Sequence, residues 1–290
     1  MFSQVRLSVL GTAFLLLVRA SAAPADSHAC VWKVTSPDHH VLYLGGSVHA
    51  LRGVDYPLPA PYNVAFEASE RLVFEADPGA MKSFAQRVEK KARYPRGDAL
   101  SNHVDPRTYA YLRRLFAVVK VPESKFASYR PWFIALLLED PALHGLSSEL
   151  GVESYLERRA GANHKPISGL ESPEEHLQVF SGLTDHQGEV LVLLSLAPGE
   201  ENGADSSAIL SAWRHGDVET LARHAHKGLS IFPAFEERVL DARTRSWIPK
   251  IERDLASGHT YLVVVGAAHL GGRSGALALL RARGYTITQL

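Results

Sequence analysis

Two segments of the chain share one pattern, Leu42-Tyr43-Leu44-Gly45-Gly46-Ser47-Val48-His49 and Val263-Val264-Val265-Gly266-Ala267-Ala268-His269. Each begins with apolar, β-branched or aromatic residues, as buried strands do, and ends in Gly-x-x-His. Ligands and catalytic groups of α/β proteins collect at the carboxyl ends of strands, and glycine allows close approach there. The pair of segments therefore predicts a sheet with two histidines, His49 and His269, at its carboxyl edge.

The other elements predict an α/β fold. Further strands are expected at residues 31–34, 71–77, 165–170 and 285–289. Helical periodicity dominates the middle of the chain and includes two long helices, expected over residues 123–138 and 233–256. We expect one domain over residues 24–290, with a central, mostly parallel sheet formed by the N- and C-terminal strands and a helical insertion or cap at about 80–256.

The composition limits which partners and which metal ligands the chain can have. The 290 residues include 31 Lys and Arg against 31 Asp and Glu, and this balance argues against a nucleic-acid partner. The single cysteine, Cys30, excludes an intrachain disulfide and any thiolate-rich metal site. With 14 histidines in the chain, imidazole and carboxylate are the ligands that a metal site would have to use.

Residues 1–23 have the features of a secretory signal peptide. Arg6 precedes the apolar run Leu7 to Val18, and Ala20-Ser21-Ala22 fits a cleavage site that requires small residues. A helix needs about 20 apolar residues to span a bilayer, so the run is too short, although a retained anchor is the alternative. We expect a secreted or periplasmic protein with no stable membrane span after cleavage.

A carboxylate at a third strand end completes the candidate site. Glu75 closes the apolar strand Leu72-Val73-Phe74, and Asp77 follows it on the same strand face. Such a carboxylate must meet a cation, a donor or solvent, because burying it unpaired is costly. Two histidines with a carboxylate can bind zinc, manganese or cobalt, and can also activate water as a general base.

Two further charged residues are candidates with open alternatives. Glu171 ends the strand at 165–170 and could belong to the site, or could only supply negative charge to the start of the next helix. Arg243 could bind a substrate carboxylate, pair with Glu75 or Glu171, or form a surface ion pair.

Several short motifs, in a fixed order, resemble the TraB/PrgY/GumN family, which includes the Tiki membrane proteases. The resemblance extends from Val31 to the C-terminus. Besides the two Gly-x-x-His segments, it rests on Val73-Phe74-Glu75-Ala76-Asp77, Arg130-Pro131-Trp132, Gly169-Leu170-Glu171-Ser172, Trp213-Arg214-His215-Gly216-Asp217 and Leu270-Gly271-Gly272.

The resemblance implies an α/β fold related to erythromycin-esterase-like and ChaN-like proteins, and a site built from His49, His269 and Glu75. In the Tiki branch this site is associated with proteolysis that depends on a divalent metal. The chain departs from the family pattern at Thr244, where an Asn is usual, and at His176, where a Gln is usual. Thr244 can replace only part of the hydrogen bonding of an Asn.

Three hypotheses follow. The leading one is a metal-dependent hydrolase, peptidase-like, in which His49, Glu75 and His269 hold a divalent ion of the Mn, Co or Zn class. Glu171 or Asp77 would take the proton and Arg243 would stabilise negative charge. The second is an esterase-like hydrolase without metal, with His49 as general base. The third is a non-catalytic protein that binds a peptide or an envelope component. The expected substrate is a peptide or a small molecule.

Overall fold

The computed structural model of the chain describes residues 28–197 and 206–290, and the segment expected to be a signal peptide lies outside these ranges. The strands are β1 (Val31–Thr35), β2 (Val41–Ser47), β3 (Arg71–Ala76), β4 (Ile167–Glu171), β5 (Tyr261–Gly266) and β6 (Thr286–Gln289). They form one mixed sheet in the order β4-β3-β5-β2-β1-β6. This architecture confirms the α/β class and the central sheet.

The four strands β4, β3, β5 and β2 run parallel, and their register aligns the ends that carry the candidate residues. Ser47 at the end of β2 is level with Gly266 at the end of β5, and Ala76 of β3 is level with Glu171 of β4. Sequence segments more than 200 residues apart therefore end at the same edge of the sheet. One strand, β4, comes from within the expected helical insertion and forms an outer edge of the sheet.

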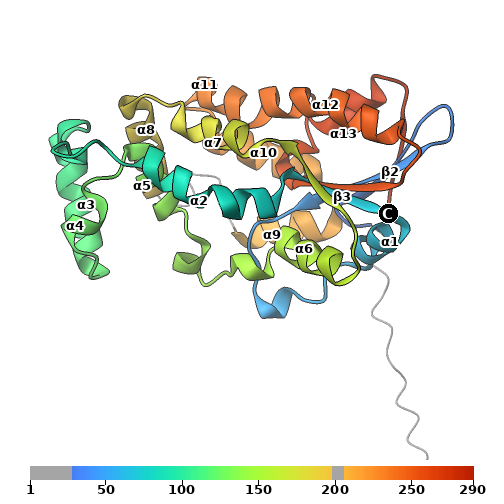
Figure 1. Cartoon of the computed structure of the whole chain (residues 1–290), viewed down its shortest axis with the longest axis horizontal. Coiled ribbons are helices and arrows are strands. Elements are labelled where there is room, and N and C mark those ends of the chain that lie inside the picture. The colour runs from blue at the N-terminus through green and yellow to red at the C-terminus, as the bar shows by residue number, and fades with distance from the viewer. Residues whose placement is uncertain (1–27, 198–205) are drawn as a thin grey trace, which may run out of the picture.

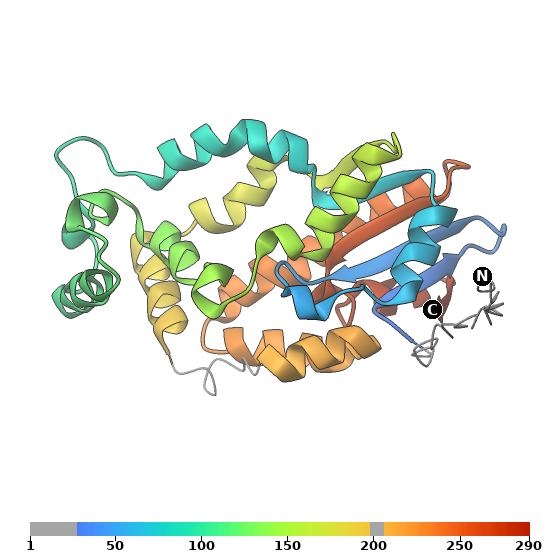
Figure 2. The ribbon, with the colours of Figure 1, turned by 90° about the horizontal axis from the view of Figure 1, so that it is seen from below.

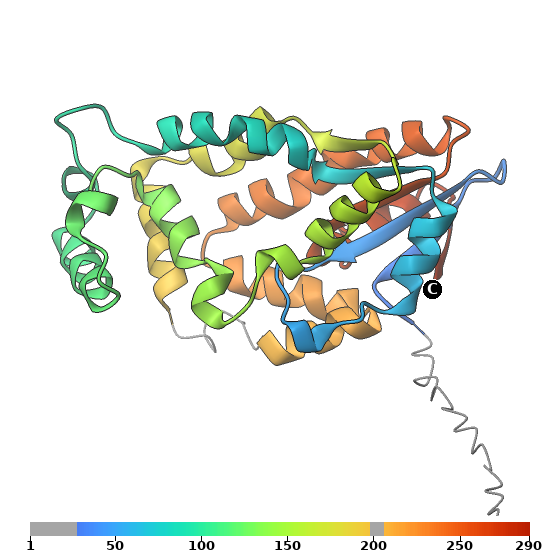
Figure 3. The ribbon, with the colours of Figure 1, turned by 60° about the horizontal axis from the view of Figure 1, so that its bottom comes forward.

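Helices cover both faces of the sheet and extend beyond one end of it. Their bounds are α1 (Ala60–Ala68), α2 (Pro78–Ala92), α3 (Pro106–Val118), α4 (Glu123–Phe126), α5 (Pro131–Leu138), α6 (Val152–Ala162), α7 (Pro173–Ser181), α8 (Asp185–Leu196), α9 (Ser206–His215), α10 (Val218–Leu229), α11 (Pro233–Glu236), α12 (Ala242–Leu255) and α13 (Ala276–Arg281). In Figure 1, α12 and α13 lie along one face of the sheet and α1 and α6 along the other. Helices α3 and α4 lie at the end of the molecule farthest from the sheet, as Figures 2 and 3 also show.

The molecule has more than one apolar core. The largest surrounds the sheet and contains the buried side chains of Phe66, Phe74, Trp213 and Trp247. A second core lies among the helices beyond the sheet, around Phe126 and its neighbours. The inner parallel strands β3 and β5 are buried on both faces, which explains their nearly continuous apolar sequences. The boundaries of the expected single domain stay a prediction.

Two of the expected long helices are interrupted. The helix expected over residues 123–138 is split into α4 and α5, because Arg130 precedes a proline and takes the extended conformation that this position favours. The helix expected over residues 233–256 consists of α11, a π-helical turn η5 (Glu237–Asp241) and α12. Turns of this kind are often found at functional sites. This turn leads directly into Arg243 and Thr244.

Within the described ranges, no helix combines the length and the apolar character needed to cross a membrane.

Candidate active site

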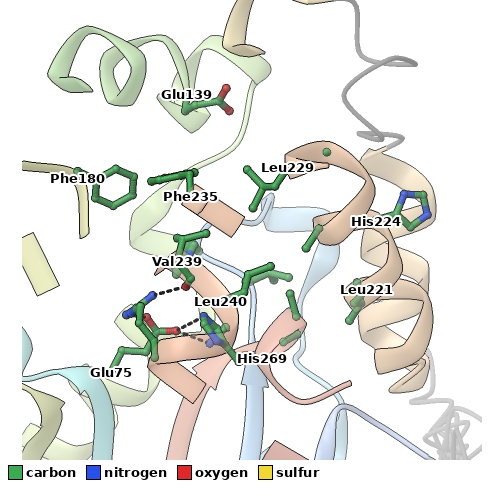
Figure 4. Close-up of a pocket in the computed structure, with 18 of the residues that line it drawn as sticks. Glu75, Glu139, Phe180, Leu221, His224, Leu229, Phe235, Val239, Leu240 and His269 are labelled. Carbon is green, nitrogen blue, oxygen red and sulfur yellow. Dashed lines mark hydrogen bonds and ion pairs between the residues drawn. The ribbon is translucent and has the colours of Figure 1, made fainter. Parts of the chain in front are cut away.

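The carboxyl edge of the parallel strands opens into a cavity of about 680 Å³. Four of the five predicted site residues line it, namely His49, Glu75, Arg243 and His269. Figure 4 shows Glu75 and His269 side by side at its base. The fifth, Glu171, is not part of the lining but is tied to the cavity floor through Arg243. The topology thus brings these five residues to one edge of the sheet.

Arg243 holds the two glutamates. From the start of α12, its Nη2 donates to Glu75 Oε2 at 2.6 Å, while its Nε donates to Glu171 Oε1 at 2.8 Å. The side chains of all three are almost fully buried, with exposed fractions of 11% for Arg243, 12% for Glu75 and 6% for Glu171. Of the alternatives open for Arg243, the structure shows the pairing with both carboxylates. This cation compensates two buried negative charges.

Two further side chains hold Glu171, and the sequence pattern pointed to neither contact. Trp247, one turn after Arg243 on α12, donates its indole N–H to Glu171 Oε1 at 2.8 Å. His176 on α7 places Nδ1 3.1 Å from Glu171 Oε2 and 3.2 Å from Arg243 Nη2. Burial alone would raise the pKa of Glu171, but hydrogen bonds from His176 and Arg243 and the charge of Arg243 lower it to about 2. Glu171 is therefore an ionised anchor, held away from the open cavity.

Glu75 is held from its other side by the backbone. Its Oε1 accepts the N–H of Gly266 at 2.7 Å. A Cβ at Gly266 would lie 3.2 Å from that oxygen and 3.4 Å from the ring of His269, so a side chain there would crowd both groups. Burial alone would raise the pKa of Glu75, but the charge that His269 carries once protonated, the charges of Arg243 and His49, and the Gly266 N–H lower it to about 2. Glu75 is a carboxylate at neutral pH.

His269 is held in one tautomer by Thr244. The Thr244 hydroxyl donates its only hydrogen to the carbonyl of Leu240 at 2.8 Å. Its oxygen lies 2.8 Å from His269 Nδ1 and can only accept there, so Nδ1 carries the proton. The other nitrogen, Nε2, is then unprotonated and lies 3.9 Å from Glu75 Oε1. Burial lowers the pKa of His269 to about 4, and the imidazole is neutral at pH 7. Thr244 thus orients His269 from a position where the family pattern usually has an Asn.

His49 is held by a carboxylate that the sequence reasoning missed. Its Nδ1 lies 2.9 Å from Oε1 of Glu153, an oxygen that also accepts the hydroxyl of Ser47 at 2.5 Å. The charge and the hydrogen bond of Glu153 raise the pKa of His49. The His49 side chain is 74% exposed, whereas that of Glu153 is 24% exposed. Glu153 and His49 therefore form a carboxylate–imidazole pair at the wall of the cavity.

Close backbone packing explains how Glu153 reaches His49. Helix α6 begins after Gly151, where an added Cβ would lie 2.2 Å from the carbonyl oxygen of His49. The N–H of Val152 donates to the carbonyl of Val48 at 3.1 Å. The first turn of α6 thus lies directly against the second half of the first Gly-x-x-His segment. The glycine before the helix was the available signal, but about 100 residues separate it from His49.

The first Gly-x-x-His segment also depends on its glycine. A Cβ at Gly46 would lie 2.3 Å from the sulfur of Cys30, which is an impossible contact. The carbonyl of Gly46 accepts the indole N–H of Trp213 at 3.0 Å and the hydroxyl of Tyr62. These contacts hold the end of β2 where the chain turns toward His49.

Asp77 does not belong to the cluster, which corrects one sequence expectation. It caps α2, where its Oδ1 accepts the N–H of Ala80 at 2.8 Å. The strand β3 ends at Ala76, so the alternation that would have placed Asp77 beside Glu75 stops one residue too early. An aspartate before a proline at the first helical position is a common helix start.

The arrangement does not form a three-ligand metal site as it stands. Both carboxylate oxygens of Glu75 accept hydrogen bonds, from Arg243 and from Gly266. Nδ1 of His49 is bonded to Glu153. Within the described residues, no group of three or more His, Cys, Asp or Glu side chains has the geometry of a metal site. The site expected at His49, Glu75 and His269 stays a prediction.

Comparison with known proteins relates this chain to one family. The profile of the TraB/PrgY/gumN family matches residues 30–289. The protein YbaP of Escherichia coli K12, described as uncharacterized, is 24% identical over 254 residues, covering 86% of this chain and 90% of YbaP. YbaP of Shigella flexneri matches with the same identity and coverage. No solved structure gives a significant match. Because the family profile spans almost the whole described chain, the protein belongs to the TraB/PrgY/gumN family.

Proposed function

We propose that this protein is a hydrolase in which His269 activates water and the His49–Glu153 pair protonates the leaving group. One observation carries the proposal: two imidazoles line the same cavity, each held through Nδ1, one by a hydroxyl and the other by a carboxylate. When the surroundings of two titratable groups shift their pKa values in opposite directions, the group with the raised pKa can act as the acid and the other as the base. The reaction class that fits is cleavage of an ester or amide bond by water.

His269 is suited to act as the base. Its Nδ1–H is held by Thr244, so the lone pair of Nε2 is available to accept a proton from water. The proton taken from water makes His269 an imidazolium, and the carboxylate of Glu75, 3.9 Å from Nε2, stabilises that charge. The hydroxide equivalent then adds to the carbonyl carbon of the substrate. Burial keeps the pKa of His269 near 4 even with the charge of Glu75 beside it, so His269 is a weak base whose imidazolium form Glu75 stabilises.

His49 is suited to act as the acid. Glu153 favours its protonated form, which raises the pKa of His49 and keeps a proton available near neutral pH. When the tetrahedral intermediate collapses, His49 gives a proton to the departing alcohol or amine. His269 then releases its proton to solvent and His49 takes one up, which restores both starting protonation states. This assignment reverses the sequence hypothesis that His49 is the general base. Arg243, bonded to Glu75 and Glu171, orients the carboxylates in this scheme.

A metal-dependent peptidase is the second candidate. It is favoured by the unprotonated Nε2 of His269, which lies 3.9 Å from Glu75 Oε1, since both residues line the same cavity. Nitrogen and oxygen donors of this kind suit divalent ions of the Zn, Mn or Co class. As described above, the side chains do not converge on such an ion in their present arrangement, so the residue-based scheme is the better supported.

The test compares conservative variants against a matched surface histidine. His269→Gln should lower turnover of both p-nitrophenyl esters and casein-derived peptides by about 100-fold or more, whereas His49→Gln should do so only for the peptides, because p-nitrophenolate leaves without taking a proton. His259→Gln is the control, because His259 is exposed and pairs with Glu70. Circular dichroism establishes that each variant is folded. If His269→Gln retained the activity of the control, the proposed role of the base would be wrong.

A chelator separates the two candidates and a binding assay covers the non-catalytic alternative. Activity that survives exhaustive treatment with EDTA supports the residue-based scheme. Activity that is lost with EDTA and restored by Mn²⁺, Co²⁺ or Zn²⁺ supports the metal-dependent peptidase. Tight binding of peptides with no product from any substrate would favour the non-catalytic binding protein.

A further inference from the structure

The cavity has a wall that the proposed chemistry does not use. Above the polar floor, the helices α5, α7, α8 and α10, together with α11 and η5, contribute apolar side chains, among them Leu136, Phe180, Leu191, Leu229, Phe235 and Val239. Figure 4 shows Phe180, Phe235 and Leu229 between Glu139 at one end and Glu75 with His269 at the other. The wall therefore runs from the reacting groups toward the rim of the cavity.

Part of this apolar wall is exposed to solvent. Leu136 is 37% exposed although it lines the cavity, so apolar surface is open there. Open apolar surface is unfavourable in water, and its cost is removed when an apolar ligand covers it. A cavity of about 680 Å³ falls in the range of sites that enclose drug-sized ligands. A ligand with an apolar portion would therefore gain affinity from this wall.

The apolar part of the wall, as distinct from Glu139, Ser195 and His224 in the same lining, suits an acyl chain better than a peptide main chain. A peptide main chain carries a donor and an acceptor at every residue, and each needs a partner when it is buried. The side chains of Leu136, Phe180, Leu229 and Phe235 offer none. A hydrocarbon chain has no such groups along its length and can cover the wall without leaving polar atoms unpaired.

We propose that the substrate is a carboxylic ester or amide whose acyl side is a medium-length hydrocarbon chain. The chain lies against the apolar wall, and its carbonyl carbon faces His269 and Glu75 on the floor. Water adds to that carbon and the bond to the alcohol or amine breaks. The products are a fatty carboxylate, the alcohol or amine, and one proton, which an amine retains as ammonium and which otherwise passes to solvent. The proposal rests on the hydrolase function proposed above.

The matched pair Leu136 and Leu137 provides the test. Both lie on α5 with similar exposed fractions, 37% and 39%, but only Leu136 lines the cavity. Leu136→Asp places a charge against the acyl chain, while Leu137→Asp places it on the outer surface. Both substitutions are at exposed positions, so both variants should fold.

Two measurements are made on each protein. The first is kcat/KM for p-nitrophenyl acetate, butyrate, hexanoate and octanoate, and the second is the Kd of octanoate by calorimetry. We expect kcat/KM to rise about fourfold for each methylene that is buried. Leu136→Asp should weaken octanoate binding and octanoate ester turnover by about tenfold, and Leu137→Asp should stay within about twofold of the unaltered protein.

The outcomes separate this proposal from the hydrolase proposal. Ester turnover that is independent of chain length and of Leu136 would overturn the acyl chain and leave the hydrolase intact. Octanoate binding that depends on Leu136, without turnover of any ester, would support the acyl site and overturn the catalytic proposal. If octanoate does not bind, or if both leucine variants lose binding equally, the acyl site is wrong.

Discussion

Replacing Thr244 by valine should release His269 from its tautomer and destabilise the protein. The substitution keeps the branched shape and removes only the hydroxyl. Thr244 is 2% exposed, and its hydroxyl makes two hydrogen bonds of 2.8 Å. Each bond contributes about 1 kcal/mol net, and a buried donor left without a partner costs about 1–3 kcal/mol. We therefore expect the free energy of unfolding to fall by about 2–3 kcal/mol. The midpoint of thermal unfolding should fall by about 4–12 °C.

The same variant tests the tautomer. With no acceptor at Nδ1, the proton can move to Nε2, where Glu75 Oε1 can accept it after a small shift from 3.9 Å. Nitrogen NMR of histidine-labelled protein distinguishes the two tautomers, and His269→Gln assigns the signal. Activity should fall through kcat rather than KM, since the base is then protonated on the nitrogen that must accept. Thr244→Ser retains the hydroxyl and should restore both the tautomer and most of kcat.

Thr220→Val is the matched control. Thr220 also uses its hydroxyl, as a donor to Asp217 at 2.6 Å, but on the exposed surface. We expect a loss of less than about 1 kcal/mol there and no change in the signal of His269. If Thr244→Val were as stable as this control and retained the proton on Nδ1, the inference that Thr244 sets the tautomer would be refuted.

Three other predictions concern the ion pairs and the close packing. Arg243→Met should cost about 3–5 kcal/mol in urea unfolding, because it leaves two buried carboxylates without a counter-charge, and a loss under about 1 kcal/mol would contradict the pairing. Because the folded pKa of Glu171 is lowered from 4.5 to about 2, its stabilising contribution is present above pH 4.5 and is lost as the pH falls toward 2. Glu171→Gln should flatten that part of the stability profile, and an unchanged profile would be inconsistent with this shift. Gly46→Ala should destabilise the fold by about 1–3 kcal/mol through contact with Cys30, whereas Gly53→Ala, with open space around its Cβ, should change stability by less than about 0.5 kcal/mol, and equal effects would count against the packing argument.

The sequence was most informative where chemistry and local pattern coincide. Each Gly-x-x-His histidine follows a buried strand, and parallel strands end at a common edge, so the convergence of His49 and His269 could be predicted. Glu75 was found by the same reasoning, because a carboxylate that ends an apolar strand needs a partner. Asp77 satisfied the same pattern and was still excluded, because a helix starts there and uses its carboxylate as a cap.

Contacts between distant segments could not be predicted in the same way. Glu153 lies on a helix with no catalytic signature, and it reaches His49 only because Gly151 allows α6 to pack against the backbone of His49. Trp247 is an ordinary core aromatic by its sequence, and its bond to Glu171 depends on how α12 packs against β4. Hydrogen-bond partners of this kind depend on how whole helices and strands pack against each other.

The sequence alone therefore determined the α/β class, the edge of the sheet where the candidate site lies, and five candidate residues that the fold brings to that edge. It could do so because strand burial and the residue types that end each strand are local properties. Only the tertiary structure decided which partner each group has: Thr244 for His269, Glu153 for His49, and Arg243 for both Glu75 and Glu171. Those partners set the proton positions, because hydrogen bonds, charge and burial act through distances in space and not through separation along the chain.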